Sequence, residues 1–251
     1  MNKTSKKYFN FGRNFAGEFI VIVLGVLAAL AIESWSEDRN DRVLEGNYLS
    51  RLQVDLERDL QQIGQARWAS FAQARATTTL LFAIDDPLAG EIPGFTESIK
   101  SIDFTVPATE VISDTTMGGL VWMAKRIRSF SPSRGTYDEL LATGRLLVID
   151  DEQLRSGVIN YYSLTEGSGE LGEWISEPTT RLEEVLRPTG FNAFDYQYID
   201  GPLPLLRDLN DLGFVLRDIR RRSLRQVWFL EQVEKEAKDL TNSIEEYFAS
   251  R

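Results

Sequence analysis

An uncharged apolar run near the amino end constrains this chain more than any other feature. Residues 19–32 carry no charge, and the predicted span extends over residues 15–35, with Glu18 as the one ionisable residue on the amino side of the uncharged run. At 1.5 Å per residue, a helix over this segment is about 30 Å long, which matches the hydrocarbon core of a bilayer. The sequence therefore predicts a transmembrane helix at residues 15–35.

The charges that flank this segment are asymmetric. Only cations precede it, whereas acids outnumber cations between residues 33 and 45. Lysine and arginine close to a span stay on the cytoplasmic side. We therefore predict a cytoplasmic tail at residues 1–14 and an extracytoplasmic domain at residues 36–251, held in a bacterial inner membrane with its bulk in the periplasm. The cations are Lys3, Lys6, Lys7 and Arg13, and the acids are Glu33, Glu37, Asp38, Asp41 and Glu45.

Two other interpretations of the apolar segment remain open. Ala29-Leu30-Ala31 has the small-x-small form of a signal-peptidase site, which fits a cleaved signal peptide. No helix breaker precedes that site, however, and the helical pattern continues through it, which favours an uncleaved anchor. The charge asymmetry disfavours the second alternative, a core helix buried within a soluble protein.

The composition excludes several classes of function. A net charge of −10 leaves no basic excess to neutralise phosphates, so we expect no binding to nucleic acid. The chain has no cysteine and no histidine, which excludes disulfides, thiol nucleophiles, histidine-based triads and ordinary zinc sites. We therefore expect a protein that is not an enzyme and that needs neither a metal nor a cofactor.

Long helices are predicted at both ends of the chain. No proline occurs before Pro87 or after Pro204, and proline breaks helix interiors. Apolar residues recur every three or four positions over residues 44–63 and again over 205–248, which is typical of helices that bury one face. We predict that the membrane helix continues without a stop to about residue 84 as a stalk, and that residues 205–248 form a second long helix.

Shorter helices are predicted between these two. Residues 166–186 are expected to form a helix in two parts because Pro178 interrupts them. The sequence thus predicts an all-α protein, an antiparallel bundle with the stalk and the last helix as its spine. The other expected elements are a loop at 85–106, a helix from Asp114 to about residue 128, a helix from the Ser131 N-cap to Gly144, an extended run at 146–149, a helix capped by Asp150 or Asp151 with an apolar face of Leu154, Val158, Tyr161, Tyr162 and Thr165, and a loop at 188–204.

The sequence also resembles a known family over its first quarter and its centre. The tracts GEFIVIVLGVLAALAIESWSEDR at residues 17–39 and YLSRLQVDLERDL at 48–60 are similar to the amino end of a family of uncharacterised bacterial membrane proteins. The family pattern is GE-(apolar)-G-(apolar)-NxWxxxR followed by YLxxLxxDL, and Ser34 stands where the family often has Asn. Residues 137–162 are similar to its middle region. The resemblance implies a single-span, mostly helical protein and supplies no active site.

Glu18 is the first candidate functional residue. An ionisable side chain within a span is costly and commonly marks a site for ions or protons. Gly17, Gly25 and Ala29 lie near the same helix face, and the small-xxx-small spacing of Gly25 and Ala29 lets helices pack closely. Together these residues predict a homo-oligomer with a ring of carboxylates. The alternative, favoured by the position near the predicted boundary, is that Glu18 lies among the headgroups and pairs with Arg13 or water.

A cluster of arginines in the last predicted helix is the second candidate. These residues lie off the predicted apolar stripe and fit a docking patch for an anionic ligand, lipid headgroups or an acidic partner. The alternative, which is the more common arrangement, is a solvated face that pairs with stalk acids such as Asp55, Glu57 and Asp59. The cluster comprises Arg217, Arg220, Arg221, Arg222 and Arg225.

These observations lead to two hypotheses on function. The first is a membrane-anchored, non-enzymatic helical scaffold or sensor that self-associates and meets a protein partner or ligand outside the cytoplasm. The second is an oligomeric channel-like or proton- or cation-coupled assembly that uses Glu18. An enzyme without histidine is the most distant possibility.

Overall fold

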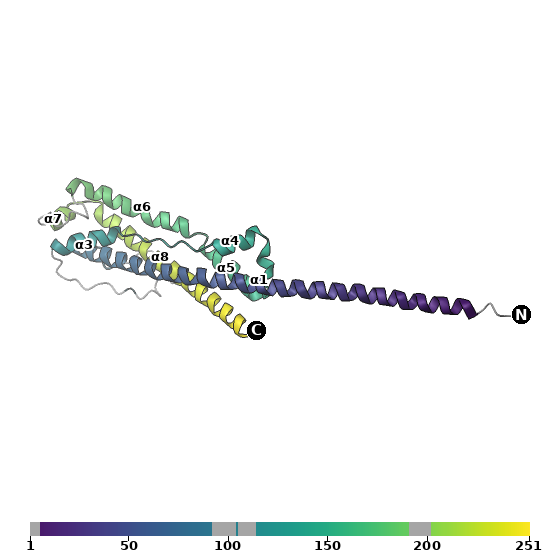
Figure 1. Ribbon diagram of the computed structural model, residues 1–251. Helices are drawn as coiled ribbons and strands as arrows, with labels where there is room; N and C mark the ends of the chain where they lie inside the picture. Colours follow the sequence, from purple (N-terminus) through teal and green to yellow (C-terminus); the bar gives the residue numbers. More distant parts are fainter. Residues whose placement is uncertain (1–5, 92–103, 105–113, 191–201) are drawn as a thin grey trace.

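The computed structural model describes residues 6–91, 104, 114–190 and 202–251, without the side chains of 6–18, 20, 114–116 and 202. All regular elements in these ranges are helical, which confirms the predicted fold class (Figure 1). In chain order they are α1 (Lys6–Ala83), α3 (Asp114–Lys125), α4 (Gly135–Ala142), the 3₁₀ turn η1 (Arg145–Val148), α5 (Glu152–Thr165), α6 (Ser168–Leu186), the 3₁₀ turn η2 (Arg187–Thr189), α7 (Pro202–Arg207) and α8 (Leu212–Ala249).

The longest element, α1, is an unbroken helix of 78 residues. Its first half projects far beyond all the other helices (Figure 1). Every residue from 21 to 43 is exposed, and the first buried residue is Glu45. The apolar segment therefore continues without a stop into a helix that ends near residue 84, as predicted.

The described side chains cover only part of the predicted membrane span, because residues 15–18 and Ile20 lie outside them. Within the side chains that are described, no helix has a stretch long and apolar enough to cross a bilayer. The large apolar residues from Val21 to Trp35 are all exposed.

The last helix, α8, runs antiparallel to α1 and is its principal packing partner (Figure 1). The antiparallel direction follows from contacts whose residue numbers rise along α1 as they fall along α8. Arg67 forms an ion pair with Glu234, and the Ser70 hydroxyl donates to Gln226 Oε1 at 2.6 Å. The helices α3 and α6 pack along this pair, α3 on α1 and α6 on α8.

Two apolar clusters form the core. The proximal cluster, nearer the free part of α1, gathers residues of α1, α4, α5 and the second half of α8, such as Leu52, Tyr161 and Val233. The distal cluster, at the other end, gathers the end of α1, α3, α6, α7 and the start of α8, such as Leu81 and Leu216.

A buried polar layer on α1 and α8 accompanies these apolar clusters. The Ser223 hydroxyl donates to Gln73 Oε1 at 2.7 Å, while Gln73 Nε2 donates to the Ala124 carbonyl at 2.8 Å. Gln226 Nε2 donates to the Arg128 carbonyl at 3.1 Å. The last carbonyls of a helix lack partners within it, so these two amides satisfy groups in and just beyond the last turn of α3 and hold it on the α1–α8 pair.

The predicted helix from Ser131 to Gly144 begins later than expected, at Gly135. The Ser133 amide donates to Asp59 Oδ1 at 2.8 Å, and the Ser133 carbonyl accepts from the Tyr162 hydroxyl at 3.0 Å. Because both backbone groups of Ser133 bond to side chains of α1 and α5, residues 131–134 stay outside the helix. Its end is as predicted: Gly144 has the left-handed φ of 67° that follows many helices.

The predicted extended run at 146–149 is wrong, because Arg145–Val148 form the turn η1. A single extended run has no strand beside it to pair with its backbone, and the turn satisfies the Ile149 amide on the Leu146 carbonyl instead. The next helix, α5, begins at the Asp151 cap, which accepts from the Leu154 amide at 2.8 Å, and all five residues of its predicted apolar face are buried.

The last predicted helix is divided. Residues 202–207 form α7, a turn follows, and α8 starts at Leu212 rather than at 205. The sequence of the turn, Asp208-Leu209-Asn210-Asp211, is rich in residues that favour turns over helix interiors. Beyond the turn, the predicted stripe of α8 is buried from Leu212 to Ile244.

Candidate functional site

The five arginines predicted as a docking patch differ in exposure. Arg220 and Arg222 are buried, with exposed fractions of 1% and 8%, while Arg217 is half-buried and Arg221 and Arg225 are exposed. The expectation that all five lie off the buried face is therefore wrong for two of them. The start of α8 packs against α1 and α6, so more of its circumference is covered than the periodicity of apolar residues indicates.

Arg220 holds the turn that follows α1. Its guanidinium donates to the carbonyls of Leu88, at 3.1 Å, and of Ala89 and Glu91. Burial lowers the pKa of Arg220, and the nearby Asp86 carboxylate opposes that effect. Backbone carbonyls at the end of a helix and in a turn lack helical donors, and Arg220 supplies donors to three of them.

Two further arginines hold the same turn from outside. Arg207 donates to the Ala83 carbonyl at 3.0 Å and pairs with Asp85 at 2.9 Å, and Arg217 pairs with Asp86. Asp85 is the only non-glycine residue with a positive φ, 57°, in the described part of the chain. The arginines thus stabilise a turn in which the positive φ of Asp85 costs free energy.

The Asp86 carboxylate lies directly against the first turn of α8. A Cβ built on Gly213 would overlap its Oδ2 atom. A helix N-terminus favours a carboxylate because its amide groups point outward. Gly213 is therefore required by this close approach rather than by its backbone conformation.

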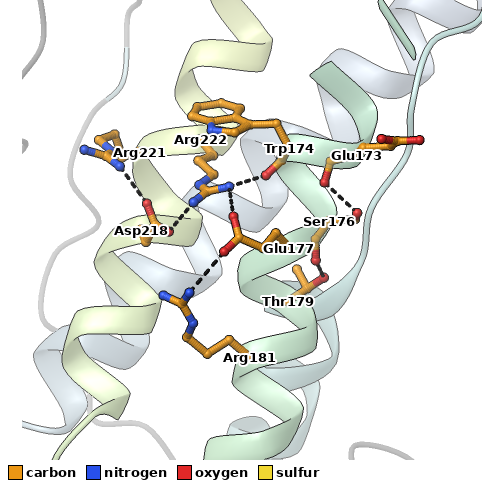
Figure 2. Close-up of polar contacts among 9 residues, drawn as sticks. All are labelled: Glu173, Trp174, Ser176, Glu177, Thr179, Arg181, Asp218, Arg221 and Arg222. Carbon is orange, nitrogen blue, oxygen red and sulfur yellow. Dashed lines mark hydrogen bonds and ion pairs between the residues drawn. The ribbon is translucent and has the colours of Figure 1, made fainter. Parts of the chain in front are cut away.

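Arg222 satisfies a carbonyl that proline leaves without a donor (Figure 2). Pro178 lies inside α6 and has no amide, so the carbonyl of Trp174, four residues earlier, receives no helical hydrogen bond. Arg222 Nη1 donates to that carbonyl and to Glu177 Oε2 at 2.8 Å, and Nη2 pairs with Asp218 at 2.8 Å. This contact accounts for a single continuous α6, where two parts were predicted.

The arginine cluster is thus engaged mainly within the fold. Its carboxylate partners are Asp86, Glu177 and Asp218, and not the stalk acids that the sequence suggested. Arg225 is the exception, because it makes no ion pair with the described residues and lies 5.7 Å from the Trp174 ring centroid. A docking role for the cluster remains a prediction, for which Arg221 and Arg225 supply the exposed cations.

A second polar cluster, in the proximal half, was missed by the sequence analysis. Asp59 is fully buried, and its Oδ2 accepts from the Tyr161 hydroxyl at 2.6 Å. Asp55, one turn earlier, accepts from the Thr136 hydroxyl at 2.6 Å. Burial raises the pKa of Asp59, against the opposing effect of its hydrogen bonds, and burial with the neighbouring carboxylate raises the pKa of Tyr161. The sequence does contain a sign that Asp59 is buried, because this residue falls on the apolar stripe between Leu56 and Ile63.

A cavity of about 460 Å³, open to solvent, lies beside this cluster. Asp55 contributes to its wall, but Asp59 does not. The two arginines that line it are paired, Arg51 with Glu139 at 2.7 Å and Arg58 with Asp55 at 3.3 Å. Both oxygens of Asp59 accept hydrogen bonds, one from the Ser133 amide and one from the Tyr161 hydroxyl, so the cluster links α1 to α5 and to residues 131–136.

The candidates in the predicted span are described only in part. The side chain of Glu18 is not among those described, and Gly17 is placed only as a residue of α1. Nothing would contact a Cβ at Gly25, and Ala29 is exposed. The predicted carboxylate ring and homo-oligomer therefore remain predictions. Within the described residues, no group of three or more acids is placed to hold a metal ion.

Comparisons with known protein families, with curated proteins and with solved structures found no match to this chain.

Proposed function

We propose that this protein is a membrane-anchored, non-enzymatic helical scaffold or sensor module, with its bundle outside the cytoplasm. The observation that carries the proposal is the stretch of α1 at residues 21–35, whose large apolar side chains are all exposed and, up to residue 32, surround the helix. Val21, Ile32 and Trp35 are 69%, 67% and 62% exposed. A helix that is apolar all round requires burial in a large core or in lipid. The charges around the apolar segment favour lipid, because only cations precede residue 15 and acids outnumber cations over residues 33–45.

The form of α1 supports transmission between the membrane and the bundle. The helix runs unbroken from the apolar segment into the core, and the first buried residue, Glu45, is ten residues beyond Trp35. At 1.5 Å per residue the bundle begins about 15 Å beyond the end of the span. A continuous helix of this kind passes a displacement or rotation of the span to the bundle.

Glu45 connects α1 to the end of the bundle that lies next to the free part of this helix. Its carboxylate accepts from the Asp150 amide at 2.9 Å, from the Tyr247 hydroxyl at 2.6 Å and from Arg251 at 2.7 Å. One residue of α1 therefore contacts the start of α5 and the end of α8. Movement of the stalk would reach both elements at once, which suits a scaffold or sensor.

Membrane extraction tests the anchor. We expect the wild-type chain to stay with vesicles after alkaline carbonate treatment, and the Leu24→Arg/Leu27→Arg double variant to be released, since each arginine at the centre of a span costs about 3 kcal/mol. Leu147→Arg is the matched control, because Leu147 is 76% exposed but lies in the bundle. Release of the intact wild-type chain, or a mature amino terminus at residue 32, would contradict the anchor.

Cysteine labelling tests the orientation without background, because the chain has no cysteine of its own. We expect Ser250→Cys to react with an impermeant maleimide in cells whose outer membrane has been permeabilised. Asn2→Cys should react only after the inner membrane is lysed. The opposite pattern would show that the bundle is cytoplasmic.

A further inference from the structure

One surface of α1 and α3 has no acid in its own sequence, in a chain that is acidic elsewhere; the acids that reach its cations come from other helices, Glu234 to Arg67 and Glu183 to Lys125. Residues 60–84 contain no Asp or Glu, and neither do residues 115–128, although the chain has 38 acids and a net charge of −10. The two stretches pack against each other, since α3 lies on α1. Their cations are Arg67, Arg75, Lys125, Arg126 and Arg128.

Arg126 lies between two exposed indoles at the centre of this surface. Its guanidinium carbon is 5.3 Å from the ring centroid of Trp68, on α1, and 5.2 Å from that of Trp122, on α3. Trp68 is 56% exposed and Trp122 is 39% exposed. The Arg126 side chain makes no hydrogen bond or ion pair with the described residues, so its donors are not used by that part of the fold.

We propose that this Trp68–Arg126–Trp122 surface binds an acidic segment of a partner protein. A carboxylate can accept two parallel hydrogen bonds from a guanidinium, and flanking apolar side chains can pack on the two indoles. Trp and Arg are the residues most enriched among those that dominate the energy of protein interfaces. The local positive charge in an acidic chain selects a partner of the opposite sign and steers its approach.

The position of the surface distinguishes this partner from two other sources of negative charge. Trp68 is 33 residues beyond Trp35 on one continuous helix, which is about 50 Å. Lipid headgroups lie too far away to reach it, an exclusion that rests on the proposed membrane anchor. A second copy anchored in the same orientation keeps its acid-rich residues 33–45 near the membrane, so only the acids of its bundle could reach this surface, and the sedimentation measurement below tests that pairing.

A second arginine–indole pair supplies a matched control. Arg39 lies 5.8 Å from the Trp35 ring centroid and is exposed, but Glu37, Asp38 and Asp41 lie within two residues of it in the sequence. This pair has the same two kinds of side chain in a stretch rich in acids. A charge reversal at Arg39 therefore changes the net charge of the chain as much as one at Arg126.

The test uses the full chain in detergent and a fluorescein-labelled peptide of glutamates with two phenylalanines, read by fluorescence anisotropy. We expect this peptide to bind at least about tenfold more tightly than the same peptide with glutamines. Arg126→Glu, and separately Trp68→Ala with Trp122→Ala, should weaken binding about tenfold or more. Arg39→Glu should change it less than about twofold. Far-UV circular dichroism checks that each variant is folded.

Four results would overturn the proposal: no binding up to about 1 mM peptide, equal losses for Arg126→Glu and Arg39→Glu, binding of phosphatidylglycerol vesicles but not of the peptide at this surface, or self-association that Arg126→Glu abolishes in sedimentation. Because the peptide is measured in detergent, its binding does not depend on the anchor. Failure of the anchor would appear only in carbonate extraction and cysteine labelling.

Discussion

The two halves of the bundle use side chains of opposite charge to satisfy buried backbone groups. In the proximal half, carboxylates such as Asp59 and Glu45 accept hydrogen bonds from tyrosine hydroxyls and backbone amides. In the distal half, Arg220 and Arg222 donate to backbone carbonyls and to carboxylates. Each charge thus satisfies backbone groups that a helix end, a turn or a proline leaves without partners, donors in one half and acceptors in the other.

The difference has a consequence for the response of each half to acid. A buried carboxyl group can take up a proton and become neutral, whereas arginine stays charged at any ordinary pH. The proximal half should therefore respond to pH and the distal half should not respond through its arginines. Four substitutions test the contacts that stabilise the two halves.

The largest effect is expected from Arg220→Ala. It removes a buried cation and takes the guanidinium donors away from three carbonyls, of which Leu88 keeps the Glu91 amide, and this should lower the free energy of unfolding by about 3–5 kcal/mol. Urea denaturation followed by circular dichroism in detergent measures the change. Arg221→Ala is the control, because Arg221 is exposed, and it should cost less than about 0.5 kcal/mol. Equal losses would show that Arg220 does not hold the turn after α1.

Gly213→Ala should have the next largest effect. The added Cβ overlaps the Asp86 carboxylate, so the turn or the first turn of α8 must move, at about 1–3 kcal/mol. The same denaturation experiment on Gly213→Ala/Asp86→Ala provides the check. If the overlap is the cause, the double variant should lose less than the sum of the two single variants.

Asp59→Asn should change the pH dependence of stability. The pKa of Asp59 is raised in the folded state, so the folded protein binds this proton more readily than the unfolded chain, whose value is 3.8. As pH falls from the raised pKa toward 3.8, this group increases the free energy of unfolding; as pH rises through the window, that gain is lost. Wild type should therefore gain stability relative to Asp59→Asn on acidification.

The control for this titration is Leu216→Ala, a destabilising change in the distal cluster that removes no ionisable group. Its stability difference from wild type should stay constant across the same pH range. A constant difference for Asp59→Asn as well would show that Asp59 does not titrate in that window.

The smallest effect is expected from Gly64→Ala, and it should be stabilising. Gly64 lies in the middle of α1, is exposed, and has open space where a Cβ would be. Alanine is better than glycine in a helix by about 0.5–1 kcal/mol, so the free energy of unfolding should rise by up to that amount. A loss of stability would indicate a neighbour at this position.

Much of the fold could be predicted because it depends on local pattern. The proline-free ends gave two long helices, the stripe at Leu49, Leu52 and Leu56 is buried, and Asp151 caps α5 as expected. The predictions were wrong where a side chain from a distant segment supplies a contact that the local sequence pattern does not indicate. Pro178 does not divide α6 because Arg222 supplies the missing donor, and Ser131 does not start α4 because Asp59 holds the Ser133 amide.

The sequence by itself determined the helical fold, the continuity of α1 and the apolar, charge-flanked character of its first half, since periodicity and composition act over neighbouring residues. Only the tertiary structure decided that Arg220 and Arg222 are buried, that Asp59 links α1 to α5, and that Trp68 and Trp122 both lie close to Arg126. Apart from the Trp122–Arg126 contact within α3 and its end, these arrangements join residues 45 to 132 positions apart, and the energy of such a contact depends on partners that no local pattern specifies.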